Sequence, residues 1–277
     1  MSAVVERGST PLAAVRSLWG NRQLIFELAR RDVIGRYRGS FVGLAWSFFN
    51  PVLLLFAYTF VFGIVFKARW AGGSIGDTST EFALVLFVGL IIHSLMADCV
   101  IRASGLVLSN PNFVKKVVFP LEILAAVTVC SALFHSLVSF AVLVLAILVV
   151  VGSLPASAIV VPLILLPYAL GVLGTTWALA SLGVFLRDIG QTVGILVMLM
   201  LFLSPIFFPL SAVPPQFVPL VKLNPLTYFV ETTREALFFG QWPAPGSLLL
   251  HGAGAVVVGC LGFWWFQKTR NGFADVI

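Results

Sequence analysis

A long uncharged stretch, placed directly after a basic cluster, constrains this chain more than any other feature of its sequence. No charged residue occurs from Leu44 to Phe66. As an α-helix this stretch is about 34 Å long at ~1.5 Å per residue, which is enough to cross a hydrocarbon core of ~30 Å. The basic cluster before it is expected to stay in the cytoplasm, and it consists of Arg30, Arg31, Arg36 and Arg38.

Composition extends this conclusion to the whole chain. Of its 277 residues, 60% are hydrophobic and only 10% are charged, whereas soluble domains carry about 25% charge. The chain is therefore expected to be an integral membrane protein. The first 40 residues are polar and basic and lack the apolar core of a cleavable signal peptide. Cys99, Cys130 and Cys260 lie far apart in apolar sequence, as buried hydrophobic residues do, and predict neither disulfides nor a metal site.

Six apolar segments are long enough to be read as membrane spans. The net charge of +6 is explained by topology rather than by nucleic acid, because all but four of the 17 Lys and Arg residues fall in segments expected to be cytoplasmic. The four exceptions are Lys67, Arg69, Lys222 and Arg234. The layout predicts both termini inside and spans at Gly43–Phe66, Phe82–Val107, Ile123–Val151, Ser157–Leu186, Gly190–Phe208 and Ser247–Phe266.

The expected fold is thus an all-α integral membrane protein in three parts. Residues 1–42 form a cytoplasmic tail and an interface helix, residues 43–268 form the six-span domain, and residues 269–277 form a second cytoplasmic tail. The interface helix is predicted over Ala14–Ile34, because apolar residues there share one face of a helix. Either it only anchors the chain, or it docks a cytoplasmic partner. Its apolar face is formed by Leu18, Ile25, Phe26, Ala29 and Val33.

The stretch 210–242 does not fit a regular span. It contains four prolines and several charged residues among apolar ones, which makes it too irregular for one span and too apolar for a free loop. Two short re-entrant helices, near Pro215–Lys222 and Thr227–Phe239, are expected to dip into the outer leaflet. Irregular backbone at that depth must be buried in protein or face a water-filled cavity.

Aromatic and charged residues within the spans suggest function. Trp46, Phe49, Phe56 and Phe60 follow helical spacing in the first span. This stripe either packs against lipid and helices, or forms a lane of flat apolar faces for the C–H groups of a sugar chain. In the second span, Asp98 and Arg102 are spaced for an i, i+4 ion pair. Charged residues inside a membrane often have a functional role. For these two residues, however, a structural ion pair near the cytoplasmic end is the favoured interpretation.

Sequence signatures of catalysis are missing. No Gly-Lys dipeptide occurs, so the chain has no phosphate-binding P-loop, and it has no HExxH sequence. His93, His135 and His251 each stand alone in apolar sequence and predict no metal site. If ATP drives this protein, another chain must hydrolyse it.

Three stretches together resemble the membrane subunits of type-2 ABC exporters, in the branch that exports O-antigen, capsular polysaccharide and teichoic acid. The first is the opening of the first span, RRDVIGRYRGSFVGLAWSFFNPVLLLFAYTFVFG. The others are SNPNFVKKVVFPLEIL after the second span and LNPLTYFVETTREALFFG before the last. With the six-span layout, the resemblance covers nearly the whole chain.

The resemblance implies a homodimer of permeases in the bacterial cytoplasmic membrane, working with two P-loop ATPase subunits that bind ATP and Mg²⁺. This chain itself would hold no cofactor. The ATPase would dock on the interface helix and the first cytoplasmic loop, at Arg30, Arg31, Asp32, Asn110, Phe113, Lys115 and Lys116. The first and fifth spans would line the path at Trp46, Phe49, Phe56, Phe60, Met198 and Phe202. The external gate would include Asn224, Pro225, Tyr228, Glu231 and Arg234.

Three hypotheses follow. The first is export of a lipid-linked polysaccharide, driven by ATP hydrolysis on a partner. The second keeps this machinery and changes the cargo to a lipid, drug or antibiotic. The third is a membrane-embedded transferase, which needs acid/base or metal-binding residues around one cavity and finds support only in Asp98 and Arg102. A passive channel is disfavoured, because nothing resembles a selectivity filter.

Overall fold

The computed structural model describes residues 10–66, 79–114 and 119–276, and its regular secondary structure there is entirely helical. The all-α expectation is therefore confirmed. The longer helices are α1 (Pro11–Gly20), α2 (Arg22–Arg36), α3 (Trp46–Tyr58), α4 (Ser79–Ala103), α6 (Ile123–Val150), α7 (Val161–Phe185), α8 (Ile189–Leu203), α10 (Pro225–Phe238) and α11 (Pro245–Thr269). Short helices are η1 (Gly43–Ala45), the π-helix η2 (Thr59–Val65), α5 (Pro111–Val114), η3 (Ala156–Val160), η4 (Leu210–Ala212), α9 (Val218–Leu223), η5 (Arg270–Gly272) and α12 (Phe273–Val276).

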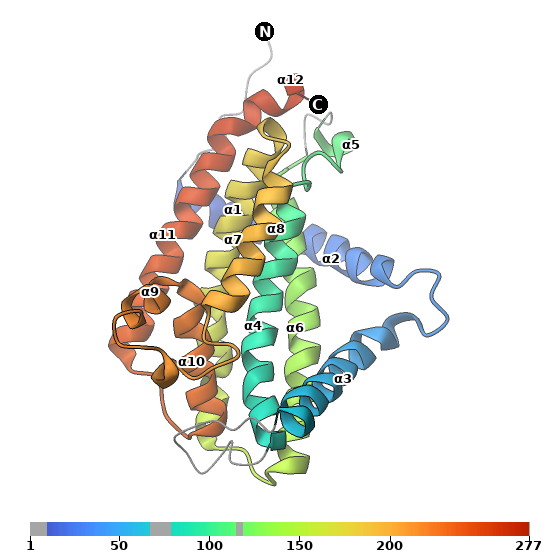
Figure 1. Cartoon of the computed structure of the whole chain (residues 1–277). Helices are drawn as coiled ribbons and strands as arrows, with labels where there is room; N and C mark the ends of the chain where they lie inside the picture. Colours follow the sequence, from blue (N-terminus) through green and yellow to red (C-terminus); the bar gives the residue numbers. More distant parts are fainter. Residues whose placement is uncertain (1–9, 67–78, 115–118, 277) are drawn as a thin grey trace.

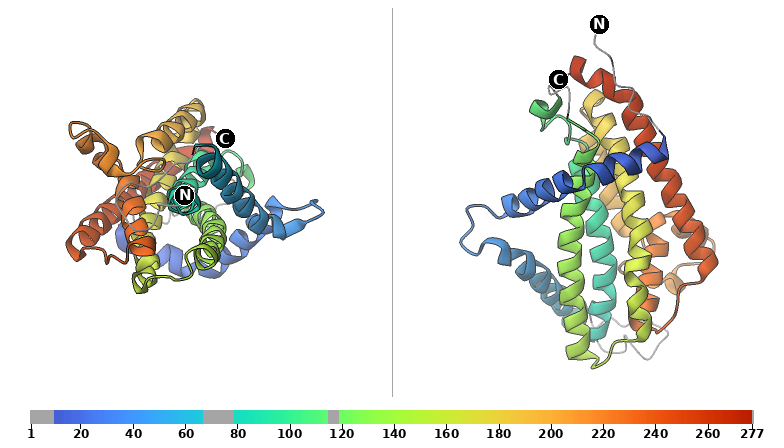
Figure 2. Two further views of the ribbon diagram at one scale, coloured as in Figure 1. Left: turned by 60° about the horizontal axis from the view of Figure 1, so that its bottom comes forward. Right: turned by 180° about the vertical axis from the view of Figure 1, so that it is seen from behind.

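The long helices form a bundle whose two ends differ. Figure 1 shows α4, α6, α7 and α11 running along the bundle, with α12 and α5 at one end and α3 leaning away from the side. We call the end with α12 the terminal end. The pair α1–α2 runs across the bundle near this end, which is clearest in the rear view of Figure 2. We call the pair α1–α2, which crosses the bundle near its terminal end, the crossbar.

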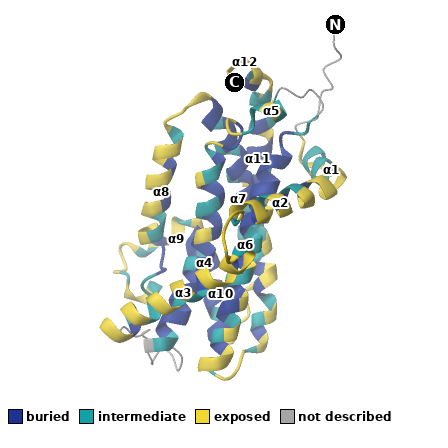
Figure 3. Cartoon of the chain, turned by 90° about the vertical axis from the view of Figure 1, so that its right-hand side faces the viewer, coloured by how far each residue is buried: buried dark blue, intermediate teal, exposed yellow. Residues whose placement is uncertain are grey.

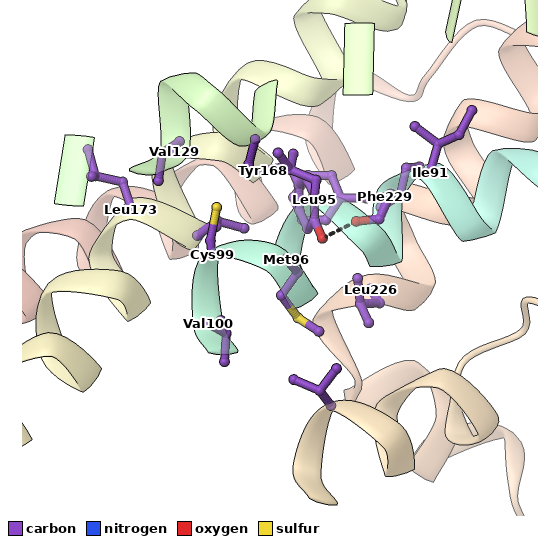
Figure 4. Packing of buried hydrophobic residues seen from close by; sticks show 14 of the residues in the cluster. Ile91, Leu95, Met96, Cys99, Val100, Val129, Tyr168, Leu173, Leu226 and Phe229 are labelled. Carbon is purple, nitrogen blue, oxygen red and sulfur yellow. Dashed lines mark hydrogen bonds between the residues drawn. The ribbon is translucent and has the colours of Figure 1, made fainter. Parts of the chain in front are cut away.

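Helix α4 forms the centre of the bundle. It packs against α6, α7, α8 and α10, and Figure 3 shows it as mostly buried while α3 and α8 are largely exposed. Figure 4 shows Leu95 and Cys99 of α4 close to Tyr168 of α7 and Phe229 of α10. Tyr168 also donates its hydroxyl to the carbonyl oxygen of Ile92 at 2.7 Å. Burial of a tyrosine here is tolerated because its hydroxyl has a partner.

Helices α7 and α11 cross at unusually short range through glycines. A Cβ added to Gly262 would lie 2.0 Å from the carbonyl oxygen of Gly174. A Cβ added to Gly174 would lie 2.5 Å from the carbonyl oxygen of Val258. Such backbone contact replaces the hydrophobic driving force that helices lack inside a bilayer. The two glycines thus set how closely the two helices can approach.

Five of the six expected spans are long and apolar enough to cross a membrane. Within the described residues these are Gly43–Val65, Thr80–Ala103, Ile123–Val150, Ala156–Phe185 and Pro245–Val276. The fifth expected span, Gly190–Phe208, is represented by α8, which has 15 residues and is only about 22 Å long at ~1.5 Å per residue. It ends early because Ser204 precedes Pro205 and takes an extended conformation, with ψ 150°, as residues before proline prefer.

The predicted single interface helix is instead two helices. The break is at Asn21, which has φ −102° and ψ 16° and whose side-chain amide donates to the carbonyl oxygen of Ser17 at 2.7 Å. Asparagine competes for backbone hydrogen bonds in this way and thereby ends helices. The expected apolar face is partly wrong as well, since Phe26 is exposed whereas Ile25, Ala29 and Val33 are buried.

Part of the predicted C-terminal tail, within residues 269–276, packs against the bundle. Phe273 of α12 is fully buried and contacts Phe185 of α7 and Phe266 of α11. The sequence also predicts disorder over residues 1–13 and an external loop over Lys67–Thr80. The first prediction is wrong for residues 11–13, which begin α1, and the second is wrong at its end, because α4 begins at Ser79. The rest of both predictions, at residues 1–9 and 67–78, lies outside the described residues.

Candidate functional site

A cleft lies between α2, the terminal-end part of α4, α5 and the start of α6, and has a volume of about 870 Å³. Four of the residues predicted to dock an ATPase line it, namely Arg31, Asp32, Asn110 and Phe113. They come from two segments about 80 residues apart, so the fold brings the two predicted docking segments into one site. We call this hollow the terminal cleft.

The remaining predicted docking residues lie beside the terminal cleft or beyond the described residues. Arg30 lines a neighbouring hollow of about 350 Å³ on the outer side of α2. Lys115 and Lys116 are outside the described residues, so their predicted role remains a prediction.

Local contacts hold the loop side of the terminal cleft in shape. Asn110 donates its side-chain amide to the carbonyl oxygen of Leu106 at 2.9 Å, and Pro111 begins the single turn of α5. The rings of Phe113 and Phe119 stack with centroids 4.2 Å apart and an angle of 13°. Pro111 and Pro120 fix their own φ angles at the two ends of this stretch.

Four charged residues join α2 to α4 at the wall of the terminal cleft. Arg102 donates from one nitrogen, Nη2, to both carboxylate oxygens of Asp32 at 2.8 Å. Arg36 donates to both oxygens of Asp98 at 3.1 and 2.8 Å. The predicted ion pair between Asp98 and Arg102 is present at 3.6 Å, and each of the two groups also makes a shorter contact with α2. The pair is therefore one part of a four-residue cluster, which we call the quartet.

The quartet is only partly shielded from water. Its side chains keep about a third of their surface exposed. Burial raises the pKa of Asp32, but the hydrogen bonds its carboxylate accepts and the positive charges of Arg102 and Arg36 outweigh this effect. The pKa of Asp32 is therefore lowered from its ordinary value, and the side chain stays ionised at neutral pH.

Apolar contacts hold α2 against α6 next to the quartet. Ile25, Ala29 and Val33 of α2 are buried, and α2 contacts α6 along this face. Tyr37, just after α2, lies edge-on to His135 of α6 with ring centroids 5.8 Å apart. Helix α2 is thus linked to two long helices, by charge to α4 and by apolar packing to α6.

Glu122 forms a second junction at this end, which the sequence analysis did not identify as a site. Its carboxylate accepts hydrogen bonds from Ser17 of α1 at 2.7 Å and from Arg270 at 2.9 Å. Arg270 also donates to the carbonyl oxygen of Phe119, and Trp177 of α7 donates to that of Glu122. A lone acid two residues after a proline, at the start of an apolar span, was the available signal, since a charge at such a position needs a partner.

The six residues predicted to line a translocation path all face outward from the chain. Trp46, Phe49, Phe56 and Phe60 of the first span, and Met198 and Phe202 of α8, have exposed fractions between 36% and 71%. Near the far end, Phe202 contacts Phe207, and Phe207 stacks on Phe62 of the first span. A lane formed by these surfaces would need a second surface to close it.

The two predicted helices of the external gate are present as α9 and α10, and Asn224 joins them. Its side chain accepts a hydrogen bond from the backbone of Leu226 at 3.0 Å and donates to Ser204 at 2.8 Å. Pro225 then occupies the first turn of α10. Tyr228 stacks on His251 of α11 with ring centroids 3.5 Å apart. These residues connect the end of α8 with α10 and α11.

Arg234 lies inside the protein, although a place at the exit was predicted for it. Its side chain is 2% exposed. It donates to the carbonyl oxygens of Val85 at 2.9 Å and Ile206 at 2.7 Å, and to that of Pro205. It also pairs with Glu231 at 3.0 Å. Arg234 therefore provides hydrogen bonds to carbonyl groups that follow the end of α8 and have no helical partner. Irregular backbone at membrane depth requires such partners.

Comparisons with known proteins agree with this architecture. The profile of the family described as "ABC-2 type transporter" matches residues 23–238. The chain is 28% identical over 267 residues to the O-antigen export system permease protein RfbA of Myxococcus xanthus, covering 95% of this chain and 98% of that protein. It is 25% identical over 256 residues to RfbA of Klebsiella pneumoniae, covering 92% and 95%. The family profile spans most of the helices described above, and the chain belongs to the ABC-2 type transporter family.

Proposed function

We propose that this chain is the permease subunit of an ATP-driven exporter that moves a lipid-linked polysaccharide of the O-antigen type across the bacterial cytoplasmic membrane. The cargo is supported by the names of the relatives, which are permeases of O-antigen export systems. The alignments with them cover more than nine-tenths of both chains. The support for a transport subunit is the family itself.

The proposed topology has six crossings with both termini in the cytoplasm. Five helices have the length for it, and α8 makes the remaining crossing together with the segment that follows it. Arg234 supports this proposal, because its hydrogen bonds to Pro205 and Ile206 allow non-helical backbone to continue inside the protein. The excess of Lys and Arg in the segments at the terminal end favours a cytoplasmic position for that end.

The observation that carries the proposal is the terminal cleft, which unites the two predicted docking segments beside the quartet. An ATPase bound there would contact α2 directly. Because α2 is ion-paired to α4 and packed on α6, a push on α2 is transmitted to the central helix of the bundle. ATP binding that brings two ATPase subunits together would in this way change the spacing of the helices. ATP and Mg²⁺ would be held by the partner subunits.

A homodimer would provide the second surface that the outward-facing aromatic residues lack. Two copies meeting at the first span and α8 would enclose a lane with aromatic walls. Weak, repeated contacts between rings and sugar C–H groups suit transport, since a chain must be released as easily as it is bound. The lane favours a polysaccharide over a lipid, drug or antibiotic, for which continuous aromatic walls have no evident use.

The ion pairs of the quartet weigh against the transferase hypothesis. Asp98 and Arg102, the residues on which it depended, hold α2 in place through Arg36 and Asp32. Both carboxylates of the quartet are engaged in ion pairs that join α2 to α4. Coupling, rather than proton transfer, is the role that fits this geometry.

The test is affinity purification of the tagged chain from its native membranes in a mild detergent, followed by mass spectrometry. We expect a P-loop ATPase at one-to-one stoichiometry. Arg31→Glu, at the terminal cleft, should reduce its recovery at least tenfold. Arg187→Glu is the matched control, since Arg187 lies between α7 and α8 outside the residues that line the cleft, and recovery should be unchanged. Reproducible absence of any ATPase from the intact wild-type protein would overturn the proposal.

A further inference from the structure

Helix α1 presents an apolar face that the protein leaves uncovered. Leu12, Val15 and Trp19 lie on one side of this helix, and their exposed fractions are 81%, 65% and 70%. Residues on the other side, including Ala13, Ala14 and Leu18, pack against the core. The hydrogen bond from Ser17 to Glu122 fixes this orientation, so the apolar face is held outward.

Two cations are stacked on exposed tryptophans at this end of the molecule. The guanidinium of Arg22 lies 5.3 Å from the ring centre of Trp19 and donates to the carbonyl oxygen of that residue at 3.1 Å. The ammonium of Lys268 lies 4.9 Å from the ring centre of Trp264, on α11, which α1 contacts. Tryptophan rings prefer the boundary between hydrocarbon and headgroups, so each pair holds its cation at the level of lipid phosphates.

Positive charges outnumber negative ones around these pairs, although the exposed Glu27 follows on α2 and Asp275 lies on α12. Residues 10–26 contain Arg16 and Arg22 and no acidic residue. Glu122, the nearest acid in contact with α1, is buried and bound to Ser17 and Arg270. An exposed apolar face flanked by cations complements a bilayer surface that carries anionic headgroups.

We propose that α1 and the end of α11 form a binding surface for anionic phospholipid, in which Arg22 and Lys268 contact the phosphates while Leu12, Val15 and Trp19 enter the acyl region. The surface is separate from the residues that line the terminal cleft and does not depend on which cargo the protein moves. Through Ser17 and Glu122 it is connected to the start of α6, so lipid composition would influence the same crossbar that the ATPase is proposed to move.

The experiment uses the tagged protein purified with its co-purifying subunits, delipidated, and titrated with phosphatidylglycerol or phosphatidylcholine under native mass spectrometry. Each cation near a lipid surface contributes about fivefold to the preference for anionic lipid. The double variant Arg22→Gln/Lys268→Gln should therefore lower the ratio of phosphatidylglycerol to phosphatidylcholine affinity at least about tenfold. The charge-preserving variant Arg22→Lys/Lys268→Arg should keep the wild-type ratio.

Removal of two charges elsewhere provides the matched control. Arg187→Gln/Lys222→Gln deletes exposed cations that have no described tryptophan partner and should change the ratio less than twofold. An unchanged ratio in Arg22→Gln/Lys268→Gln would overturn the proposal, as would an equal loss in the control. A loss of ATPase recovery with the lipid ratio unchanged would also overturn it, because the surface would then be a protein contact. Thermal stability equal to that of the wild type would show that the variants are folded.

Discussion

Arg102 and Arg234 show how one type of side chain serves two different purposes in this molecule. Arg102 binds one carboxylate on a neighbouring helix, lies within reach of a second acid, and keeps more than a quarter of its surface exposed. Arg234 is buried and binds three backbone carbonyl groups besides Glu231. A partly solvated ion pair can exchange partners at little cost, whereas buried carbonyl groups cannot lose theirs. The first region is built to move and the second to stay fixed.

The largest effect is expected from Arg234→Gln. The shorter side chain would leave buried carbonyl oxygens and Glu231 without their partner, which costs roughly 3–5 kcal/mol for a broken buried pair. We expect a fall of about 10 °C or more in the melting temperature, measured by fluorescence-detected size exclusion after heating. Lys222→Gln, an exposed cation nearby in sequence, should melt like the wild type. Equal melting of the two variants would remove the distinction between a fixed and a movable region.

A second large effect is expected from Gly262→Ala, which tests whether α7 and α11 also belong to the fixed part. The added Cβ would lie 2.0 Å from the backbone of Gly174, so the helices must separate, at a cost of about 1–3 kcal/mol. Gly254→Ala on the same helix is the control, because nothing lies within 4 Å of its Cβ position. Heat stability should fall in the first variant alone, and a stable Gly262→Ala protein would show that this crossing is adjustable.

A small loss of stability with a large loss of coupling is expected from Asp32→Arg. An ion pair this exposed contributes about 0–1 kcal/mol, so the protein should fold. Like charges on α2 and α4 should nevertheless separate these helices, and export per ATP hydrolysed by the ATPase that stays bound should fall at least tenfold. Both rates are measured in the same proteoliposomes.

The reciprocal exchange Asp32→Arg/Arg102→Asp is the control for this prediction. It restores opposite charges across the contact and should recover part of the export rate. If the exchange is no better than Asp32→Arg alone, the quartet does not couple α2 to α4.

The smallest effect on stability is expected from Phe49→Ala in the proposed lane. Phe49 is 47% exposed, and its loss should shift the melting temperature by no more than about 1 °C, in line with other surface substitutions. Export of a long polysaccharide should fall several-fold, since a wall contact is removed from both copies of a dimer.

Leu166→Ala is the control for the lane, because Leu166 is 69% exposed on α7, which is not expected to line the path. It should leave export unchanged. Equal export by both variants would favour a small cargo over a polymer.

Much of the fold could be predicted because it rests on local properties. The length of an apolar run, a proline and a charge imbalance are visible without knowing any contact, and they indicated the spans, α9 and α10. The site could be predicted in part, since the residues around the terminal cleft belong to two recognisable segments. The break at Asn21 was missed because the apolar spacing continues across it, whereas the helix ends at the non-helical backbone of Asn21, whose side chain donates to Ser17.

The sequence by itself determined that this chain is a multi-pass, all-helical membrane protein of an exporter family, because hydrophobicity and motif content add up residue by residue. The tertiary structure alone decided which charges meet. Arg36 and Asp98 are 62 residues apart, and Arg102 and Asp32 are 70 apart. Sequence spacing predicted only the pair of Asp98 and Arg102, which is present at 3.6 Å beside these two shorter contacts. A charged side chain forms its shortest ion pair with the acid or base that the fold places nearest to it. The distances between side chains of distant segments are set only when the helices pack.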